Sequence, residues 1–433
     1  MKAIDILGKA REVVLRYSLC DACLGRLFGM LGYGLDNRER GRAIKTLLLM
    51  EAYNALKGEC DLTLISRLAA SGFEPALQSL AKVGVEVLRE ECYVCEGIMD
   101  RIAELVDMCI RAGEGYEYRT FQVGCRLPRR FMKREEDLWV TYDLGLSESI
   151  KSELTREVGK ALQGRTGRKY SPVSPDLVFI LDLEKWSVEV SIKPLFIYGR
   201  YRKLVRGLPQ SPWRYGYDSR VAYRTSIEEL ITRPLVEMAR GSRAKLHAAG
   251  REDLDVRTLG NGRPFIVEVK DPRVRSLDLK LAEKRINEGA GGLVEVDVLR
   301  FVDGKLVPKL KAFAELARKT YLARVRFSQP VSSEELARLE EEFTDAIVRQ
   351  RTPLRVLGRR PDKVRKKVVY SLRVERLDGR EARLVITCQG GLYVKELIHG
   401  DQGRTKPSVA GVLGVDVEIL ELDVIWIEEP SLA

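Results

Sequence analysis

Histidine and long apolar runs are the two features that this sequence most lacks. His247 and His399 are the only histidines among 433 residues, too few for a metal site built from imidazoles, and we interpret both as hydrogen-bonded structural residues or phosphate contacts. No run approaches the roughly 18 apolar residues of a membrane span. Residues 1–18 are too charged for a secretory signal. We therefore expect a cytoplasmic protein that does not enter a membrane.

Acidic residues are outnumbered, and this imbalance points to an anionic partner. The chain has 74 Lys and Arg against 63 Asp and Glu, a net charge of +11, and only 7% aromatic residues. The basic residues recur in short clusters at 126–134, 199–206 and 359–367. Such clusters favour a folded surface that follows a phosphate backbone. A basic surface that serves solubility alone is the alternative.

The first half of the chain has the pattern of an α/β unit. A chain of 433 residues is expected to form two or three domains. Apolar spacing predicts helices over 38–58 and 147–167, the second beginning at Ser147 or Ser149 and ending at Gly164 or Gly167. The run 175–199 predicts a hairpin or two adjacent strands packed on the second helix.

The second half has a mixed α+β pattern. We expect helices over 225–239 and 334–349, strands within 262–269 and 291–307, and a hairpin over 366–390. The Pro- and Gly-rich stretch before them is the best candidate linker. The predicted organisation is an accessory region over 1–205, a linker over 206–218 and a catalytic domain over 219–433.

Two C-x-x-C pairs predict a structural zinc site. Disulfides are not expected in a cytoplasmic protein, and four thiolates suit tetrahedral zinc without leaving an open coordination position. The predicted ligands are Cys20, Cys23, Cys92 and Cys95. A redox role is the alternative, but neither pair follows a βαβ pattern. The other cysteines we interpret as packing residues.

A charged loop at 250–257, with the sequence GREDLDVR, is the strongest candidate for a catalytic segment. Gly250 permits a sharp turn, and Leu254 and Val256 can anchor one side of the loop. The alternative is a solvated loop whose charges pair with each other. Further on, Lys395 lies among apolar neighbours, where a lysine needs an anionic partner.

These segments together resemble the archaeal Pus10 family of tRNA pseudouridine synthases. The resemblance is carried by GREDLDVR, by GLYVKELIHGDQGRTKPSV at 391–409, by GRYRKLVRGLPQSPW at 199–213 and by the two C-x-x-C pairs. It implies a helical accessory region with a four-cysteine zinc site and a THUMP RNA-binding domain. A catalytic domain with a central antiparallel sheet follows. It further implies isomerisation of uridine at positions 54 and 55 of the tRNA T-arm without an organic cofactor, and we expect a monomer.

The resemblance also assigns roles to individual residues. Asp253 is the expected catalytic carboxylate, with Lys395 pairing with it in a dry pocket. The residues expected to contact the substrate nucleotide are Arg251, Tyr321, Val394, Lys395 and Leu422. Glu252, Asp255 and Arg257 are expected to hold the loop in shape. The carboxylate could attack the sugar, stabilise its charge or remove a neighbouring proton, and the sequence does not choose among these roles.

Basic residues near these segments are the candidates for tRNA phosphate contacts. They are Arg200, Arg202, Lys203, Arg206, Arg404 and Lys406. Contacts of this kind predict binding that weakens steeply with salt.

Three other functions compete with the isomerase. An RNA-binding or processing factor would not need Asp253. A methyltransferase would need a glycine-rich nucleotide loop after a strand, which the second half lacks. A hydrolase that uses Asp253 with Glu252 or Asp255 would release free base.

Overall fold

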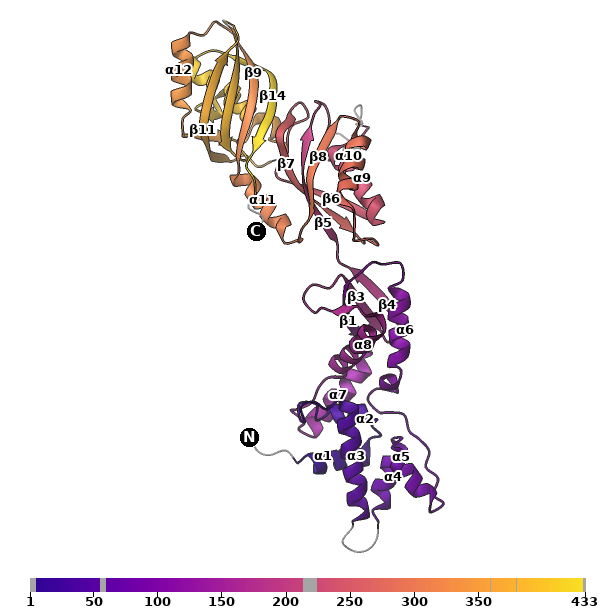
Figure 1. Cartoon of the computed structure of the whole chain (residues 1–433). Helices are drawn as coiled ribbons and strands as arrows, with labels where there is room; N and C mark the ends of the chain where they lie inside the picture. The colour runs from indigo at the N-terminus through magenta and orange to yellow at the C-terminus, as the bar shows by residue number, and fades with distance from the viewer. Residues whose placement is uncertain (1–4, 55–59, 213–223, 359, 379, 431–433) are drawn as a thin grey trace. The chain divides into compact units, whose positions relative to one another are not determined.

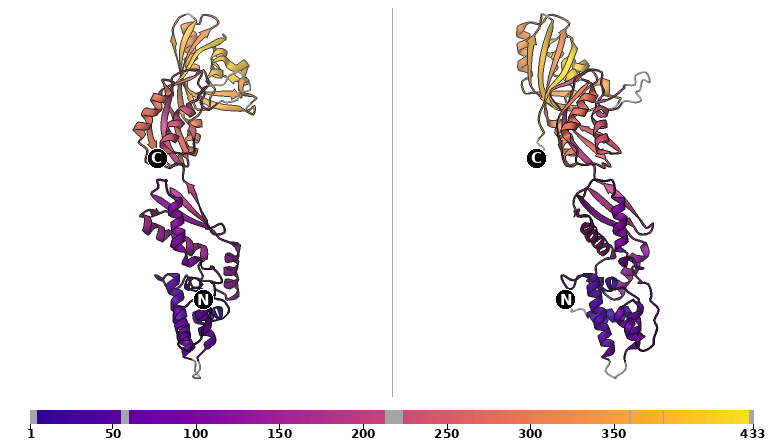
Figure 2. Two further views of the ribbon diagram at one scale, coloured as in Figure 1. Left: turned by 90° about the vertical axis from the view of Figure 1, so that its right-hand side faces the viewer. Right: turned by 45° about the vertical axis from the view of Figure 1, so that its right-hand side comes forward.

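The computed structural model describes residues 5–54, 60–212, 224–358, 360–378 and 380–430. The chain divides into two compact units, residues 1–192 and 193–433, and each contains helices and a sheet of its own (Figures 1 and 2). Within these described ranges, no helix is both long enough and apolar enough to cross a membrane.

The first unit begins with helices. They are α1 (Ile6–Arg16), α2 (Asp21–Arg26), α3 (Asn37–Tyr53), α4 (Leu62–Ala70), α5 (Glu74–Ala81), α6 (Ile102–Ala112), α7 (Arg129–Thr141) and α8 (Ile150–Thr166). The predicted cap residues of α8 are confirmed, because Ser149 accepts a hydrogen bond from Ser152 N and Gly167 ends the helix in a left-handed conformation. The predicted apolar face of α3 is only partly buried, since Ile44 is buried and Leu47 is half exposed.

The sheet of the first unit has the strand order β2-β1-β3-β4. Its strands are β1 (Thr120–Arg126), β2 (Lys169–Tyr170), β3 (Leu177–Asp182) and β4 (Ser187–Ile192). Strands β3 and β4 form the predicted antiparallel hairpin, and α8 shares their apolar core. The end of the predicted run, β5 (Leu195–Lys203), instead belongs to the sheet of the second unit. The units therefore divide earlier than the expected boundary at residue 205.

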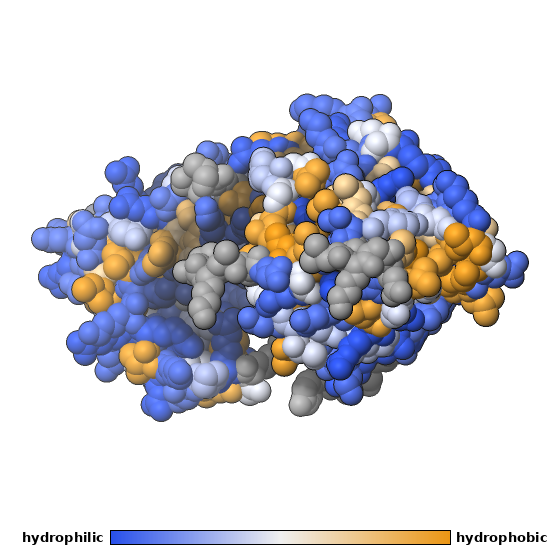
Figure 3. Space-filling view, turned by 90° about the horizontal axis from the view of Figure 1, so that it is seen from below, coloured by the Kyte–Doolittle hydropathy of each residue, from blue (hydrophilic) through white to orange (hydrophobic). Residues whose placement is uncertain are grey.

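The first unit also exposes apolar side chains between α2 and α3. Met30 and Leu35 are exposed, and Tyr33 has almost no contact with the rest of the chain. Figure 3 shows one face of the molecule, on which apolar groups are interspersed among hydrophilic ones.

The second unit is built on one ten-stranded sheet with the order β13-β10-β11-β12-β9-β14-β7-β5-β8, and β6 pairs with β7. Its strands besides β5 are β6 (Arg243–Ala248), β7 (Arg257–Lys270), β8 (Val294–Phe301), β9 (Arg318–Phe327), β10 (Ala346–Arg351), β11 (Val364–Arg376), β12 (Glu381–Gln389), β13 (Thr405–Lys406) and β14 (Val417–Ile427). The sheet is mixed, because β7 and β14 pair in parallel and the other described pairs are antiparallel.

Helices cover parts of this sheet. They are α9 (Ile227–Ala239), α10 (Leu279–Ala290), α11 (Leu306–Leu316), α12 (Ser333–Glu342), α13 (Val394–His399) and α14 (Val409–Leu413). Figure 1 shows α9 and α10 side by side next to β8, and these two helices share one apolar core with β5 and β7.

Two sequence-based predictions in this unit are wrong in detail. The predicted helix 334–349 ends at Glu342, and its β-branched end becomes β10 after a turn in which Asp345 has a φ of 50°. The expected linker is no linker over 206–212, because Leu208 is buried in the core of the second unit and Pro209 O accepts a hydrogen bond from Ile227 N at 3.0 Å. Residues 213–218 lie outside the described residues.

Candidate active site

The charged loop joins the antiparallel strands β6 and β7, and Gly250 makes its turn. Gly250 has a φ of +90°, which disfavours a side chain. A Cβ atom there would lie 3.0 Å from Lys319 Nζ and 3.1 Å from Arg263 Nη1. The backbone conformation therefore favours glycine, as the sequence predicted, and a side chain would also have to displace the ends of Lys319 and Arg263.

Side chains of the same unit bind the loop through its backbone carbonyls. Four donors, which we call the carbonyl clamp, contact five carbonyl oxygens. They are Arg263 Nη1 to Ala249 O at 2.8 Å, Gln210 Nε2 to Gly250 O at 3.0 Å, Lys203 Nζ to Asp253 O at 3.1 Å and to Leu254 O at 2.8 Å, and Arg206 Nη1 to Asp255 O at 2.6 Å. These donors hold the backbone at residues 249, 250 and 253–255.

Lys203 and Arg200 are buried, which contradicts their predicted role as tRNA phosphate contacts. Lys203 is 0% exposed, and burial lowers its pKa to about 8. The Arg200 guanidinium donates to Gly262 O at 2.9 Å and to Ile427 O at 3.0 Å. The physical reason is the position of β5, which lies between β7 and β8 inside the sheet.

The other residues predicted to contact phosphate differ in their exposure and in their partners within the protein. Arg202 pairs with Glu295 and Asp297, and Arg206 belongs to the carbonyl clamp while staying partly exposed. Arg404 donates to Thr352 O at 2.7 Å and pairs with Asp362. Lys406 is exposed. For these four residues a phosphate contact remains a prediction.

Glu252 anchors the loop from inside the protein. Its side chain is 1% exposed, and an oxygen of its carboxylate lies 2.8 Å from Arg263 Nε. The Tyr201 hydroxyl lies 3.0 Å from both oxygens of the same carboxylate. Burial and the nearby Glu252 raise the pKa of Tyr201 well above its ordinary value, so the phenol stays protonated and donates. Glu252 thus has the shape-holding role expected of it.

Asp253 presents its carboxylate at the surface of the loop, where its side chain is 40% exposed. Arg355 Nη1 lies 3.1 Å from Asp253 Oδ2, and Lys395 Nζ lies 3.5 Å from the same oxygen. Lys395 is closer to Asp255, whose two oxygens both accept from it at 2.7 Å. Lys395 therefore contacts Asp253 as expected but pairs more closely with Asp255. The Asp253 carboxylate was expected in a dry pocket and is instead partly exposed.

Arg355 is a member of the site that the sequence did not reveal. It lies in a short 3-10 turn, Leu354–Val356, between β10 and β11, four residues before the basic cluster at 359–367. Its Nε atom contacts Glu396 Oε1 at 2.6 Å. Burial acts to lower the pKa of Arg355, but Glu396 and Asp253 outweigh it and raise the pKa above its ordinary value. No motif pointed to this arginine, because its partners are distant in the sequence.

The residues expected to contact the nucleotide come from three further elements. Tyr321 on β9 is partly buried, and burial, with the nearby Cys388, Glu252 and Asp253 charges contributing, raises its pKa. Leu422 on β14 is buried, and its carbonyl accepts from Arg206 at 2.8 Å. Val394 is buried at the start of α13, which carries Lys395.

The sheet register brings two of these residues together. Leu422 on β14 pairs with Ala323 on β9, two residues after Tyr321. Arg251 is exposed, and within the described part of the chain it makes no ion pair. Among the residues predicted to contact the nucleotide, Arg251 is therefore the one least restrained by the rest of the site.

The four predicted cysteines come together in the first unit. Their sulfur atoms all lie within 4.8 Å of one another. Cys20 caps the start of α2 and Cys23 lies in its first turn, while Cys92 and Cys95 occupy the turn before α6. Tetrahedral zinc with bonds of about 2.3 Å needs sulfur atoms about 3.8 Å apart, and Cys20 Sγ lies 3.7 Å from Cys95 Sγ. The group can hold a metal ion.

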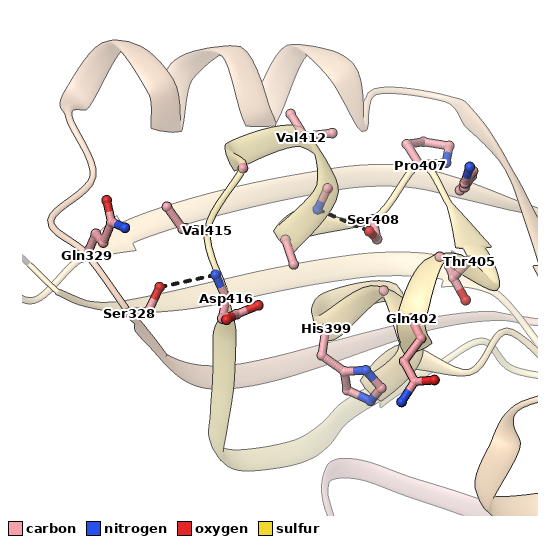
Figure 4. Close-up of a pocket in the computed structure, with 16 residues that line it drawn as sticks. Ser328, Gln329, His399, Gln402, Thr405, Pro407, Ser408, Val412, Val415 and Asp416 are labelled. Carbon is pink, nitrogen blue, oxygen red and sulfur yellow. Dashed lines mark hydrogen bonds between the residues drawn. The ribbon is translucent and has the colours of Figure 1, made fainter.

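A separate cavity lies beyond the far end of α13. Its volume is about 570 Å³, and its lining includes Ser328, His399, Gln402, Lys406 and Asp416 (Figure 4). His399 Nδ1 accepts a hydrogen bond from Asp401 N at 3.1 Å, and His247 contacts Glu268, so both histidines are hydrogen-bonded as expected. None of the predicted nucleotide contacts lines this cavity.

Comparison with known proteins gives consistent matches over the whole chain. The family model described as Pus10, C-terminal, matches residues 196–428, and the model described as Pus10 THUMP domain, archaeal, matches residues 105–182.

Full-length relatives agree with these matches. A protein of Thermofilum pendens named tRNA pseudouridine synthase Pus10 is 50% identical over 99% of this chain and 97% of its own length. A protein of the same name from Methanothrix thermoacetophila is 42% identical over 98% of this chain and 94% of its own length. Among solved structures, a chain of a Cbf5-Nop10-Gar1 complex is 20% identical, with a TM-score of 0.28 over 44% of this chain and 42% of that chain.

Proposed function

The chain belongs to the Pus10 family of tRNA pseudouridine synthases, and we propose that it isomerises uridine in the T-arm of tRNA, at positions 54 and 55, with Asp253 as the catalytic carboxylate. The observation that carries the assignment of Asp253 is its partly exposed carboxylate beside two cations, on a loop whose carbonyls are clamped. Glu252 is buried and paired with Arg263, which excludes it, whereas Asp255 is exposed and pairs with Lys395, so the choice of Asp253 over Asp255 rests on the resemblance of GREDLDVR to the family's catalytic motif.

The reaction explains why the site combines these groups. The bond from C1′ to N1 must break, the uracil must rotate, and C1′ must bond to C5. The sugar carbon becomes electron-poor on the way, so an ionised carboxylate beside it can stabilise the charge, attack the carbon or remove a neighbouring proton. Arg355 and Lys395 place two positive charges beside the Asp253 carboxylate.

Holding the base requires a different kind of surface. A stacked base must leave its helix before it reacts, and an aromatic ring with an apolar wall can hold it while it rotates. Tyr321 and Leu422, on the neighbouring strands β9 and β14, supply these two groups. Arg251, exposed beside Asp253, is suited to contact a phosphate or to fill the space that the base vacates.

The cysteine group of the first unit is a structural zinc site in this proposal. Four thiolates leave no open coordination position, so the metal would stabilise the fold around α2 and the turn before α6 without taking part in the reaction. The remaining expectations, a cytoplasmic enzyme that acts as a monomer without an organic cofactor, stay predictions.

The test is to incubate the full chain with an unmodified tRNA transcript and to map pseudouridine by carbodiimide-blocked primer extension. The wild type should mark positions 54 and 55, and substituting cytidine at either position tests each site separately. Asp253→Ala should abolish both marks, because the proposal assigns the reaction to this carboxylate alone. Asp137→Ala, which removes an exposed carboxylate from α7, serves as the control and should leave both marks.

Each competing function predicts a different result. Equal modification by wild type and Asp253→Ala would overturn the assignment of Asp253. Marks outside the T-arm would overturn the proposed target while leaving the enzyme class intact. Release of free uracil would identify a hydrolase in place of an isomerase.

A further inference from the structure

The carboxylate proposed to be catalytic is the middle member of a chain of five charged side chains of alternating sign. In order of contact they are Glu396, Arg355, Asp253, Lys395 and Asp255. They come from three segments of the second unit: the turn between β10 and β11, the loop between β6 and β7, and the helix α13. Arg355 makes its shortest contact with Glu396, and Lys395 makes its shortest contacts with Asp255.

Arg355 holds the Asp253 carboxylate more completely than Lys395 does. Arg355 Nη1 contacts Asp253 Oδ2 at 3.1 Å and Oδ1 at 3.3 Å, so it reaches both oxygens. Lys395 Nζ lies 3.5 Å from Oδ2 and makes its two shorter contacts, at 2.7 Å, with Asp255. A guanidinium is also planar and directional, whereas an ammonium acts as a point charge. The orientation of Asp253 thus depends mainly on Arg355.

Glu396 in turn holds Arg355. The Glu396 side chain is 1% exposed, and it contacts Arg355 Nε at 2.6 Å and Nη2 at 3.4 Å. The Tyr393 ring centroid lies 5.9 Å from the centre of the guanidinium. A buried carboxylate with two contacts fixes the plane of the guanidinium, and Nη1 is left to face Asp253.

We propose that Arg355 is a positioning residue for the isomerisation, which orients the Asp253 carboxylate toward the sugar while Glu396 holds the guanidinium in place. This inference rests on the proposed role of Asp253. Its physical basis is that a displacement of about 1 Å in a reacting group can cost roughly a hundredfold in rate. Arg355 acts through Asp253 and needs no contact with the reacting atoms.

The test compares Arg355→Gln, Arg355→Lys and Glu396→Gln in the full chain, with tRNA carrying tritium at C5 of uridine. Tritium leaves C5 when C1′ bonds there, so its release reports turnover. Arg355→Gln should lower kcat by about a hundredfold, with KM changed by less than about threefold. Arg355→Lys should recover part of the loss, and Glu396→Gln should lower kcat less, because Arg355 still contacts Asp253.

A matched control separates this effect from the loss of positive charge. Arg349→Gln removes an exposed arginine from β10, the strand before the Arg355 turn, and should leave kcat and KM unchanged. Hydrogen exchange across the second unit should be the same in Arg355→Gln and wild type outside residues 352–358, which would exclude general unfolding.

Two results would overturn the inference. A raised KM with unchanged kcat in Arg355→Gln would show that Arg355 contacts tRNA in place of orienting Asp253. Unchanged kcat and KM would show that the ion pair has no role. If Asp253→Ala is inactive in either case, the proposed function stands and only the role of Arg355 fails.

Discussion

The two units bury arginine–glutamate pairs for different purposes. In the first unit, the Arg26 side chain is 1% exposed and contacts Glu135 at 2.8 Å and Glu153 at 3.2 Å, so it joins α2 to α7 and α8. In the second unit, Arg263 is equally buried, but it pairs with Glu252 and donates to Ala249 O, so it fixes one loop. Similar buried chemistry thus holds helices together in one unit and positions a reactive loop in the other.

Burial alone therefore does not show whether a charged residue has a function. Removing Arg26 should affect the stability of the first unit, whereas removing a member of the carbonyl clamp should affect both the stability of the second unit and its rate.

Loss of the metal from the first unit should have the largest effect. Structural zinc in a four-cysteine site contributes about 10 kcal/mol of folding free energy, so a chelator or Cys92→Ser should remove hydrogen-exchange protection from α2 and from residues 92–100. Protection of β7 and β14 in the second unit should persist, because the two units have separate cores. Equal loss of protection in both units would contradict this expectation, and unchanged protection would contradict the metal site.

Replacing Arg26 should cost less than losing the metal. Arg26→Met leaves two buried carboxylates without their cation, and breaking a buried pair in this way costs about 3–5 kcal/mol. Denaturant unfolding followed by hydrogen exchange in α7 and α8 measures the loss. The cost should shrink as the pH falls, because burial raises the pKa of Glu135 and Glu153 and protonation removes the unpaired charge.

Arg101→Met is the control for this variant. Arg101 pairs with Glu104 at the surface of the same unit and stacks on Trp186, and exposed pairs of this kind contribute little to stability. A loss as large as that of Arg26→Met would show that burial does not set the cost.

Replacing Lys203 should have the smallest effect on stability but a clear effect on rate. Lys203→Met removes one of two donors from Asp253 O and from Leu254 O, which keep Val256 N and Gly207 N, so the cost should be about 1 kcal/mol. Since the loop then moves, kcat for pseudouridine formation should fall by roughly tenfold or more. Lys280→Met, which removes an exposed lysine from α10 of the same unit, is the matched control and should leave kcat unchanged. An unchanged kcat in Lys203→Met would show that the clamp does not position Asp253.

The pH dependence of stability provides a second measurement on the same variant. Burial lowers the pKa of Lys203 to about 8, below the ordinary lysine value of about 10.4. Between these values the unfolded chain binds more protons than the folded chain, so this lysine makes the unfolding free energy rise with pH across the window. Its contribution is fully present above about pH 10.4 and is lost as the pH falls through about 8. Lys203→Met should therefore show a shallower rise, and equal slopes would contradict the burial of this ammonium.

Local features of the fold could be predicted from the sequence because neighbouring residues decide them. Ser149 caps the start of α8 through a hydrogen bond to a nearby backbone amide, and Gly167 ends the helix through its left-handed backbone conformation. The hairpin of β3 and β4 follows from two β-rich runs with a short connection. Strand β10 was missed, because its sequence continues the helical pattern of α12 and only pairing with β11 makes it a strand.

The same distinction applies to the candidate site. The glycine of the loop, its three carboxylates and the cysteine pairs were visible in the sequence. The sequence did not show which charged side chains are exposed. Lys203 and Arg200 were expected on the surface and are buried, and Arg355 was not identified at all. The sequence of a basic cluster does not show whether its side chains contact a phosphate or a backbone carbonyl.

By itself, the sequence determined the turn at Gly250, the pairs of thiol ligands and the presence of a carboxylate-rich loop, because each depends on residues within a few positions of one another. The tertiary structure buries Glu252 and leaves Asp253 and Asp255 exposed beside cations, which the sequence does not show. Arg355 is 102 residues from Asp253, and Lys395 is 140 residues from Asp255. Such pairs form only when distant strands meet, and the burial of each charge depends on what the sheet places around it.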